Sequence, residues 1–573
     1  MKLSRMRYKL STLNSRVEFV LLLGWLLFFP RKESLLYFPS FAFLIIILSF
    51  RSIYFMKNIG LSSFSYSLSA FNLLLILSVF FAIYRYPSIL WVSGIFIISL
   101  YFILFSLDKK SGDDYFYLLI YIISAVSFFQ VIEFIVPGID RRNFFFPNPI
   151  LQGVASGMAV AATVYYLLKK FQWLFFGLLV LNGAGVYVSE SKAAFIGTAG
   201  ICLLMVLLKK KKLIPAAAGI IILTFIIPNP IKDMFIFSIK KDPYSTNRLD
   251  MWKMSLNIYQ DHAFFGVGPD NFAEVTRKYN FKQIQGPANY FKRTRSPHSD
   301  YFKLLTETGS AGFIFLLFFG FVLTKRIIAL PFFNLSTLLI LYLLFQAFVF
   351  DVIFHFFFFF IFLFLVKNLF EHQVIYKSFT LPLKVYGIFL LVFAFIVAFL
   401  CPYFSQRLTG QSQKTTDIVT RFNLLNKAEY LNPLDAQVHY LKAISLYRYF
   451  GETTNLESFY SALEKIKKVQ QLNPYFIDAY SLESDLYTHL LQEKMNYVGL
   501  SEDMTAPLTA AEQYDPSNPF IKLRKAEILL HFDFKENARQ EALKALELEP
   551  DYAAALYFLQ RNFKYFMDEG AFE

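Results

Sequence analysis

The sequence predicts an all-α fold in two parts, a polytopic bundle of about 13 transmembrane helices and a C-terminal α-solenoid of helical repeats. Three observations support this prediction. Of the 573 residues, 56% are hydrophobic, above the roughly 45–50% of a typical soluble domain. The apolar residues gather in segments long enough to cross a bilayer. After about residue 410 they give way to amphipathic stretches that end at a recurring Leu-Asn-Pro motif.

The predicted transmembrane helices come from a search for segments of roughly 20 predominantly apolar residues. The first two candidates are short or interrupted by Pro, and Asp351 alone separates the eleventh from the twelfth. The candidates lie near residues 17–30, 34–50, 66–84, 88–106, 114–136, 150–168, 171–188, 192–208, 213–228, 303–324, 330–350, 352–370 and 380–402. We therefore expect a membrane domain over residues 1–402 and a second domain over residues 403–573.

The connections between these segments predict the orientation of the chain. Lys and Arg gather in alternate connections, which include Lys109, Lys169, the run from Lys209 to Lys212, and Lys325. Such residues favour the cytoplasmic side of a membrane. The pattern therefore predicts a cytoplasmic N-terminus, and it places the loop of residues 229–302 and the tail outside. The same bias explains much of the formal charge of +14 without a nucleic-acid partner.

The tail contains a repeated helix-ending motif. It occurs at Leu431–Pro433, Leu472–Pro474, Asp515–Pro519 and Leu548–Pro550. The interval of 34 residues from Pro516 to Pro550 resembles that of tetratricopeptide repeats, and the longer earlier intervals indicate insertions. A non-repeating helical bundle is the alternative. Repeats of this kind build surfaces that bind proteins or peptides, so we expect a protein partner for the tail.

The outward loop of residues 229–302 is too long to be only a connection. It contains eleven Lys and Arg against seven Asp and Glu, and basic charge beside a membrane suits a phosphate group. Its segment STNRLDMWKMSLNIYQDH predicts a helix that begins after Ser245, Thr246 or Asn247. Arg248 would then lie in the first turn, where main-chain N–H groups favour an anion. An exposed Arg without a binding role is the alternative.

On that helix Leu249, Trp252, Leu256 and Tyr259 would share one face. Two more features follow the helix. The segment FFGVGPDNF at residues 264–272 predicts a tight structural turn. His298 then precedes a helix capped by Ser299 or Asp300. A histidine can take a proton from a hydroxyl near neutral pH; a structural role for His298 is the alternative.

Together these motifs resemble the O-antigen ligase family, which also includes O-antigen polymerases and protein O-oligosaccharyltransferases. The family pattern has an Arg, a Trp four residues later, a Gly-x-Gly-Pro turn with a nearby Phe, a His-Asn pair, and an apolar helix with Glu-x-Gly-x-x-Gly. The matching residues here are Arg248, Trp252, Gly266, Gly268, Pro269, Phe272, His298, Glu307, Gly309 and Gly312. Ser299 stands where the family has the Asn after its His.

Two earlier segments extend the resemblance, which covers roughly residues 15–370. FPNPILQG at residues 146–153 is similar to the family's Asn-Pro-Asn entry to a span and contributes Asn148. SESKAA at residues 189–194 is similar to its Ser-Arg-Ala stretch, with Lys192 in place of Arg. Lys keeps the charge, but it lacks the planar fork with which Arg binds two phosphate oxygens.

The resemblance implies a GT-C-like multi-pass glycosyltransferase of lipopolysaccharide or polysaccharide biosynthesis in the bacterial inner membrane, with the tail in the periplasm. The donor would be a glycan on undecaprenyl diphosphate. The acceptor would be a hydroxyl of lipid A-core, of another glycan or of a protein. Transfer would be inverting and would need no metal or other cofactor. His298 would act as the base and Arg248 would bind the diphosphate. The remaining substrate-binding residues would be Lys192, Arg142, Asn148, Trp252 and Asp300.

Other features leave alternatives open. Asp351 and His355 are four residues apart, so we expect them to share one helix face, either as functional groups or as a local ion pair. Arg141 and Arg142 could equally anchor the chain at the membrane interface. A transporter would require inverted repeats and broken helices, and the sequence has no such internal symmetry. A non-catalytic scaffold that acts through its repeats is the third possibility.

Overall fold

The computed structural model describes residues 58–61, 63–104, 112–136, 148–210, 243–279, 296–331, 333–370, 375–378, 400–492 and 500–563, with isolated positions at 19, 20, 23, 212, 215, 219 and 294. Several expectations fall on other residues. These are the candidate spans near residues 34–50 and 213–228, most of those near 17–30 and 380–402, and the candidate site residue Arg142.

The chain divides into two compact units, which we call the membrane-helix unit and the repeat unit. The membrane-helix unit consists of Met1–Leu77, Leu90–Trp252 and Pro297–Phe399. The repeat unit consists of Ser78–Ile89, Lys253–Ser296 and Leu400–Glu573. Sequence analysis grouped the whole loop with the membrane helices, whereas these units group residues 253–296 with the tail.

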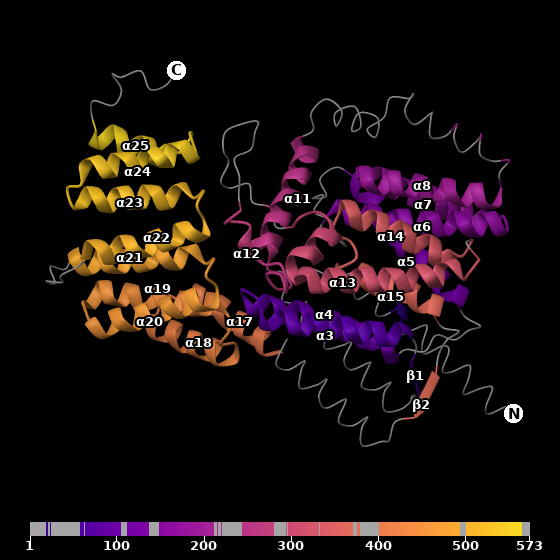
Figure 1. The fold of residues 1–573 in the computed structure, drawn as a ribbon, viewed down its shortest axis with the longest axis horizontal. Helices are drawn as coiled ribbons and strands as arrows, with labels where there is room; N and C mark the ends of the chain where they lie inside the picture. Colours follow the sequence, from indigo (N-terminus) through magenta and orange to yellow (C-terminus); the bar gives the residue numbers. More distant parts are fainter. Residues whose placement is uncertain are drawn as a thin grey trace. The chain divides into compact units, whose positions relative to one another are not determined.

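Apolar helices make up most of the membrane-helix unit (Figure 1). Six described helices are long and apolar enough to cross a membrane: α3 (Ser63–Phe80), α4 (Arg85–Leu104), α5 (Gly112–Ile135), α6 (Pro149–Lys169), α8 (Lys192–Lys209) and α13 (Asp300–Ile328). Three shorter apolar helices are α7 (Trp173–Val188), α14 (Leu335–Val349) and α15 (Phe356–Phe370). The predicted total of about 13 spans stays a prediction. The expected all-α class holds for these helices, apart from a short antiparallel pair of strands, β1 (Asn58–Leu61) and β2 (Ile375–Ser378).

Small and polar side chains join the helices α5, α6 and α7. Ser127 lies 2.9 Å from the Ser156 hydroxyl and donates a hydrogen bond of 2.9 Å to Asn182 Oδ1. Gly185 allows this approach, because a Cβ there would come within 2.8 Å of Ser156 Oγ. In lipid, small residues let helices pack closely and polar side chains bond across them. This polar cluster therefore fixes α6, most of which is buried.

The repeat unit contains a series of helices after residue 400 (Figure 1). They are α17 (Cys401–Lys414), α18 (Ile418–Leu431), α19 (Ala436–Thr453), α20 (Leu456–Leu472), α21 (Ile477–Gln492), α22 (Leu500–Tyr514), α23 (Pro519–His531), α24 (Lys535–Leu548) and α25 (Ala553–Asn562). Each pair packs together and then on the next pair. The helices α18, α20 and α24 end at the Leu of the recurring motif, as the sequence predicted. Assignment to the tetratricopeptide family stays a prediction.

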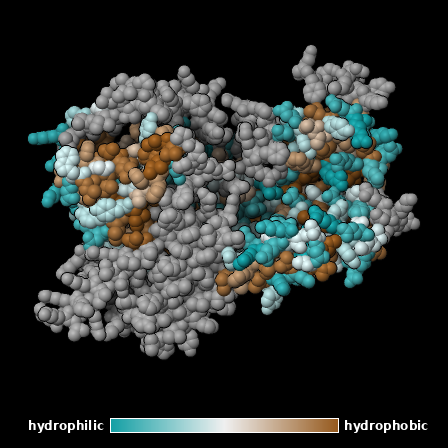
Figure 2. Space-filling model, turned by 180° about the vertical axis from the view of Figure 1, so that it is seen from behind, coloured by the Kyte–Doolittle hydropathy of each residue, from teal (hydrophilic) through white to brown (hydrophobic). Residues whose placement is uncertain are grey.

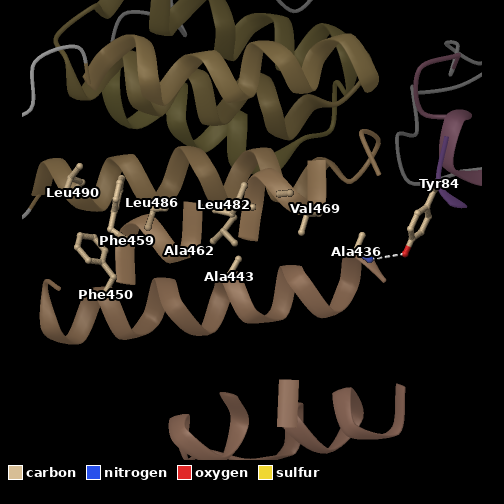
Figure 3. Close-up of a cluster of buried hydrophobic side chains, with 12 residues drawn as sticks. Tyr84, Ala436, Ala443, Phe450, Phe459, Ala462, Val469, Leu482, Leu486 and Leu490 are labelled. Atoms are coloured by element: carbon tan, nitrogen blue, oxygen red, sulfur yellow. Dashed lines mark hydrogen bonds between the residues drawn. The ribbon is translucent and has the colours of Figure 1, made fainter. Parts of the chain in front are cut away.

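The core between α19, α20 and α21 shows how the pairs join (Figure 3). Phe450 and Phe459 meet edge to face with ring centroids 5.6 Å apart, and Leu486 and Leu490 of α21 complete the cluster. Ala443 and Ala462 are fully buried and lie where α19 and α20 approach. Burial of such side chains stabilises each pair only in the presence of its neighbour.

The face in Figure 2 is mostly hydrophilic over the repeats and more hydrophobic over the membrane helices.

The loop between the membrane helices contains α11 (Pro243–Asp261) and α12 (Phe272–Val275). The start of α11 at Pro243 shows that the expected caps near residue 246 were wrong. Arg248 is the sixth residue of the helix, beyond its first turn. On the expected apolar face, Leu249 and Leu256 are 57% and 43% exposed. The buried residues of α11 include Met254 and Ile258.

Candidate functional site

His298 immediately precedes the N-cap of α13 and has a left-handed backbone conformation, with φ 50°. Its ring stacks on that of Phe350, with centroids 5.3 Å apart and an interplanar angle of 20°. The next residue, Ser299, donates a long hydrogen bond of 3.4 Å to the carbonyl of Ala347. A positive φ is uncommon outside glycine. Contacts with the C-terminal end of α14 hold the main chain of His298 in this unusual conformation and fix its half-buried imidazole.

Trp252 holds the segment before His298. Its indole Nε1 donates a hydrogen bond of 3.2 Å to the carbonyl of Pro297. The indole ring stacks on Phe302, with centroids 5.2 Å apart, and tilts against Phe348 at 5.4 Å. These contacts join α11 to α13 and α14. They give Trp252 a positioning role, and its expected contact with substrate stays a prediction.

The buried carboxyl group of Asp300 binds the turn between α14 and α15. One oxygen accepts hydrogen bonds from the main-chain N–H groups of Val352 and Ile353, at 2.8 and 2.6 Å, and the other accepts from that of Phe354, at 3.3 Å. Carboxyl groups are strong acceptors for such donors. Asp300 therefore fixes the turn next to His298. Its expected role in substrate binding stays a prediction.

The same turn corrects the expectation for Asp351 and His355. They do not share a helix face, because α14 ends at Val349 and α15 begins at Phe356. The intervening residues form bends and turns, since the side chain of Asp300 takes the main-chain donors that a continuous helix would use. Asp351 still acts electrostatically on His298.

Two charged side chains and burial set the protonation of His298. Burial lowers the pKa of the imidazole, the Asp351 carboxylate opposes this shift, and the Arg248 guanidinium adds to it. The net direction is downward from the ordinary value. A histidine with a lowered pKa is mainly neutral at neutral pH and can accept a proton. Arg248 and His298 thus lie near enough to interact, as the sequence-based interpretation requires.

Lys192 is the first residue of α8 and follows Ser191, whose hydroxyl accepts a hydrogen bond of 3.2 Å from the N–H of Ala194. Gln346 of α14 donates a hydrogen bond of 3.0 Å to the carbonyl of Ala193. One helical turn after Gln346 comes Phe350, the residue that stacks on His298. The N-terminus of α8 therefore lies at the same end of the membrane-helix unit as the imidazole, and it brings a cation there.

Asn148 caps α6. Its side-chain oxygen accepts a hydrogen bond of 2.8 Å from the N–H of Ile150. The first turn of α6 lies against the turn before α8, because a Cβ at Gly153 would come within 2.3 Å of Ser189 Oγ. Asn148 thus belongs to the same end of the unit as Lys192. The cap accounts for an Asn at this position, and direct substrate binding stays a prediction.

The glycine motif of α13 breaks the helix. Gly309 has φ 64° and ψ −157°, a conformation that is essentially restricted to glycine. Glu307 and Thr308 on the preceding turn are buried. The sequence identified these glycines only as a family pattern, and nothing in their spacing indicated a break. The break divides α13 into a short segment next to His298 and a longer apolar segment.

A cavity of about 400 Å³ lies along α13. Side chains of α3, α13, α14 and α15 line it, and nearly all of them are apolar. At one end the lining includes Asp300 and Tyr301, and toward the other it includes Thr324 and Ile327. The cavity therefore begins beside the residues around His298 and follows the membrane-spanning part of α13.

The Gly-x-Gly-Pro turn is part of the repeat unit. Gly266 and Gly268 have φ 69° and 95°, so both positions require glycine. A Cβ at Gly268 would lie 2.3 Å from the Cβ of Ala82. The ring of Phe265 stacks on that of Phe81 with centroids 4.0 Å apart. The expected structural turn is thus present. Sequence reasoning missed its partner, the segment between α3 and α4.

Among the described residues, no group of three or more His, Cys, Asp or Glu is arranged to hold a metal ion. The candidate residues that the structure places at one end of the membrane-helix unit are Arg248, Trp252, His298, Asp300, Lys192 and Asn148. With a half-buried imidazole, two cations and an adjoining apolar cavity, this end has groups that could bind an amphiphilic anion and transfer a proton. Its apolar helices make the chain a multi-pass membrane protein.

Comparison with known proteins identifies the family of the central segment. Residues 177–317 match the family model described as O-Antigen ligase, which confirms for this segment the resemblance that the motifs indicated. A search of curated proteins found no match. Among solved structures, yeast Tom70 is similar at 13% identity over 79% of this chain and 78% of that chain, with a TM-score of 0.22. That score is too low to support any argument about the fold or the function.

Proposed function

We propose that the protein transfers a glycan from an undecaprenyl-diphosphate-linked donor to an acceptor hydroxyl on the periplasmic side of the inner membrane. The observation on which this rests is the arrangement around His298. A half-buried imidazole of lowered pKa interacts with Arg248 and lies beside a long apolar cavity. The match of residues 177–317 to the O-antigen ligase family supports an activity of the ligase or polymerase kind.

In the proposed reaction His298 takes the proton of the acceptor hydroxyl. The hydroxyl oxygen then attacks the anomeric carbon of the donor sugar, and the bond from that carbon to the diphosphate oxygen breaks. Attack opposite the leaving group inverts the configuration at the anomeric carbon. Arg248 and Lys192 stabilise the negative charge on the departing diphosphate, which is where fixed cations lower a barrier most.

The cavity along α13 suits the polyprenyl chain of the donor. Its walls are apolar along the membrane-spanning length of α13, and Asp300 marks the end next to His298. An isoprenoid in this cavity would keep its diphosphate near Arg248 without burying a charge in lipid, which is costly. Asp300 and Trp252 would act by positioning the turn at residues 352–354 and the segment before His298.

The test is glycan transfer by the purified full-length protein in vesicles that contain a lipid-linked donor. His298→Ala should lower the rate by about 10²–10⁴-fold, the usual contribution of a general base. Arg248→Ala should lower it by a similar factor, and Arg248→Lys should recover part of the loss because it keeps the charge but not the fork. His262→Ala is the control, since His262 lies in the same loop. Undiminished transfer in both His298→Ala and Arg248→Ala would exclude the mechanism.

The acceptor class is open among lipid A-core, another glycan and a protein. Electrophoresis of the lipopolysaccharide from a deletion strain separates these alternatives. Loss of all long chains indicates a ligase, and capping with a single repeat indicates a polymerase. Normal lipopolysaccharide with unglycosylated proteins indicates a protein-directed enzyme. Loss of function only when residues 410–573 are deleted, with the site variants active, would favour a scaffold.

A further inference from the structure

The turns between successive repeats contact the loop that carries the O-antigen ligase motifs. Tyr84, just before α4, joins the two. Its hydroxyl accepts a hydrogen bond of 3.2 Å from the N–H of Ala436, directly after the first Leu-Asn-Pro motif (Figure 3). Its carbonyl accepts one of 3.0 Å from Asn271, directly after the Gly-x-Gly-Pro turn. One buried residue thus connects a repeat turn to the motif turn.

The motif turn is held on this side by a closed set of hydrogen bonds. Asn271 also donates to the hydroxyl of Ser88 at 2.9 Å, and Ser88 donates to the carbonyl of Pro269 at 2.6 Å. The N–H of Ile83 donates to the carbonyl of Val267 at 3.1 Å. Asn271 and Ser88 are fully buried, and hydrogen bonds are electrostatically stronger in such a site than in water.

The second Leu-Asn-Pro turn contacts other elements of the loop, the helices α11 and α12. Tyr475 is 5% exposed and packs with Met254 and Ile258 of α11. The neighbouring Asn473, itself buried, donates a hydrogen bond of 3.1 Å to Glu274 of α12 and accepts one of 3.0 Å from the N–H of Tyr475. The cluster around Tyr475 also contains Val267, Phe272 and Val275 of the motif turn and α12.

We propose that the first two inter-repeat turns of the tail form a clamp that holds the Gly-x-Gly-Pro turn and α11, so that the tail is a positioning element of the glycan-transfer site. α11 is a single helix whose C-terminal half bears Met254 and Ile258, which the clamp buries, and whose N-terminal half bears Arg248 and Trp252. This inference rests on the proposed function for its effect on transfer, but the clamp itself can be tested without any activity.

The sharpest perturbation is Asn473→Asp. An Asp can still accept the N–H of Tyr475, so the local turn is kept, but it faces the carboxylate of Glu274 with like charge and no donor. The double variant Asn473→Asp with Glu274→Gln exchanges donor and acceptor and should restore the contact. Asn455→Asp is the matched control, because Asn455 likewise accepts the N–H two residues later, that of Glu457 at 2.9 Å, and is exposed.

Hydrogen exchange of the full-length protein in nanodiscs measures the clamp directly. Amides of residues 264–275 should exchange about tenfold or more faster in Asn473→Asp and in Tyr475→Ala, and near the wild-type rate in Tyr475→Phe, in the double variant and in Asn455→Asp. Exchange in α23 and α24 should not change, which excludes general unfolding of the tail. Glycan transfer should fall by roughly tenfold to a hundredfold in Asn473→Asp, since a small misplacement of reacting groups has effects of that size, and it should recover in the double variant.

Unchanged exchange over residues 264–275 in both Asn473→Asp and Tyr475→Ala would overturn the clamp. Faster exchange with undiminished transfer would overturn its role in positioning the site. Failure of the proposed function has a different pattern, namely His298→Ala and Arg248→Ala variants that transfer glycan at the wild-type rate. The two proposals can therefore fail independently.

Discussion

Removal of the Asp300 carboxyl group should loosen the turn between α14 and α15. In Asp300→Ala the N–H groups of Val352 and Ile353 lose their acceptor, and both residues are at least nine-tenths buried. An orphaned buried donor costs about 1–3 kcal/mol, and each 1.4 kcal/mol is about tenfold in an equilibrium constant. We therefore expect these two amides to open, and to exchange with solvent, roughly 5- to 150-fold more readily.

Hydrogen exchange of a peptide spanning residues 350–356, with the protein in nanodiscs, measures this change. Ser299→Ala is the local control, because it removes only a long hydrogen bond of 3.4 Å to Ala347 and leaves the turn's acceptor in place. Asp300→Asn keeps one acceptor oxygen and should give an intermediate rate. Wild-type exchange over residues 350–356 in Asp300→Ala, in protein that retains its helix content, would show that this carboxyl group does not hold the turn.

Two further predictions follow from the site. Gly309→Ala should destabilise the protein by about 1–3 kcal/mol, because φ 64° with ψ −157° excludes a side chain. Thermal inactivation in detergent should show the loss, whereas the control Gly320→Ala, with nothing within 4 Å of its added Cβ, should be close to neutral. Second, transfer requires neutral His298, whose pKa is lowered, so the rate should fall only below about pH 6.5, the ordinary histidine value. Asp351→Asn removes the charge that raises this pKa and should move the acidic limb to lower pH. An unmoved limb would exclude Asp351 as an electrostatic partner of His298.

The helices were the most predictable part of the fold. Hydropathy alone located α6 and α8, because a span needs a long apolar segment whatever its neighbours are. The recurring Leu-Asn-Pro motif likewise marked the ends of α18 and α20. The break at Gly309 was not predictable, since a glycine in an apolar helix is usually tolerated without one. Its conformation depends on the packing of the buried side chains before it.

Candidate site residues could be selected from the sequence, but their geometry could not. The motif order singled out Arg248 and His298, and the structure brings them within electrostatic reach. The turn at Asp351 could not be foreseen, because its cause is the side chain of Asp300, 51 positions earlier. The packing of α11 could not be foreseen either. Periodicity placed Leu249 and Leu256 on one face, whereas the residues that pack with Tyr475 of the tail are Met254 and Ile258.

The spacing of the two inter-repeat turns that form the clamp constrains how chimeric chains can be built. The helices α19 and α20 separate Ala436 from Asn473. One extra helical turn in either helix would displace one of the two inter-repeat turns by about 5.4 Å. The last residue of α22, Tyr514, also packs on Tyr475, with ring centroids 5.2 Å apart. Chimeras that exchange tails between relatives should therefore be joined after α22 rather than at the membrane boundary. Such a chimera should tolerate a foreign C-terminal segment, because it keeps the first two repeats and their spacing unchanged.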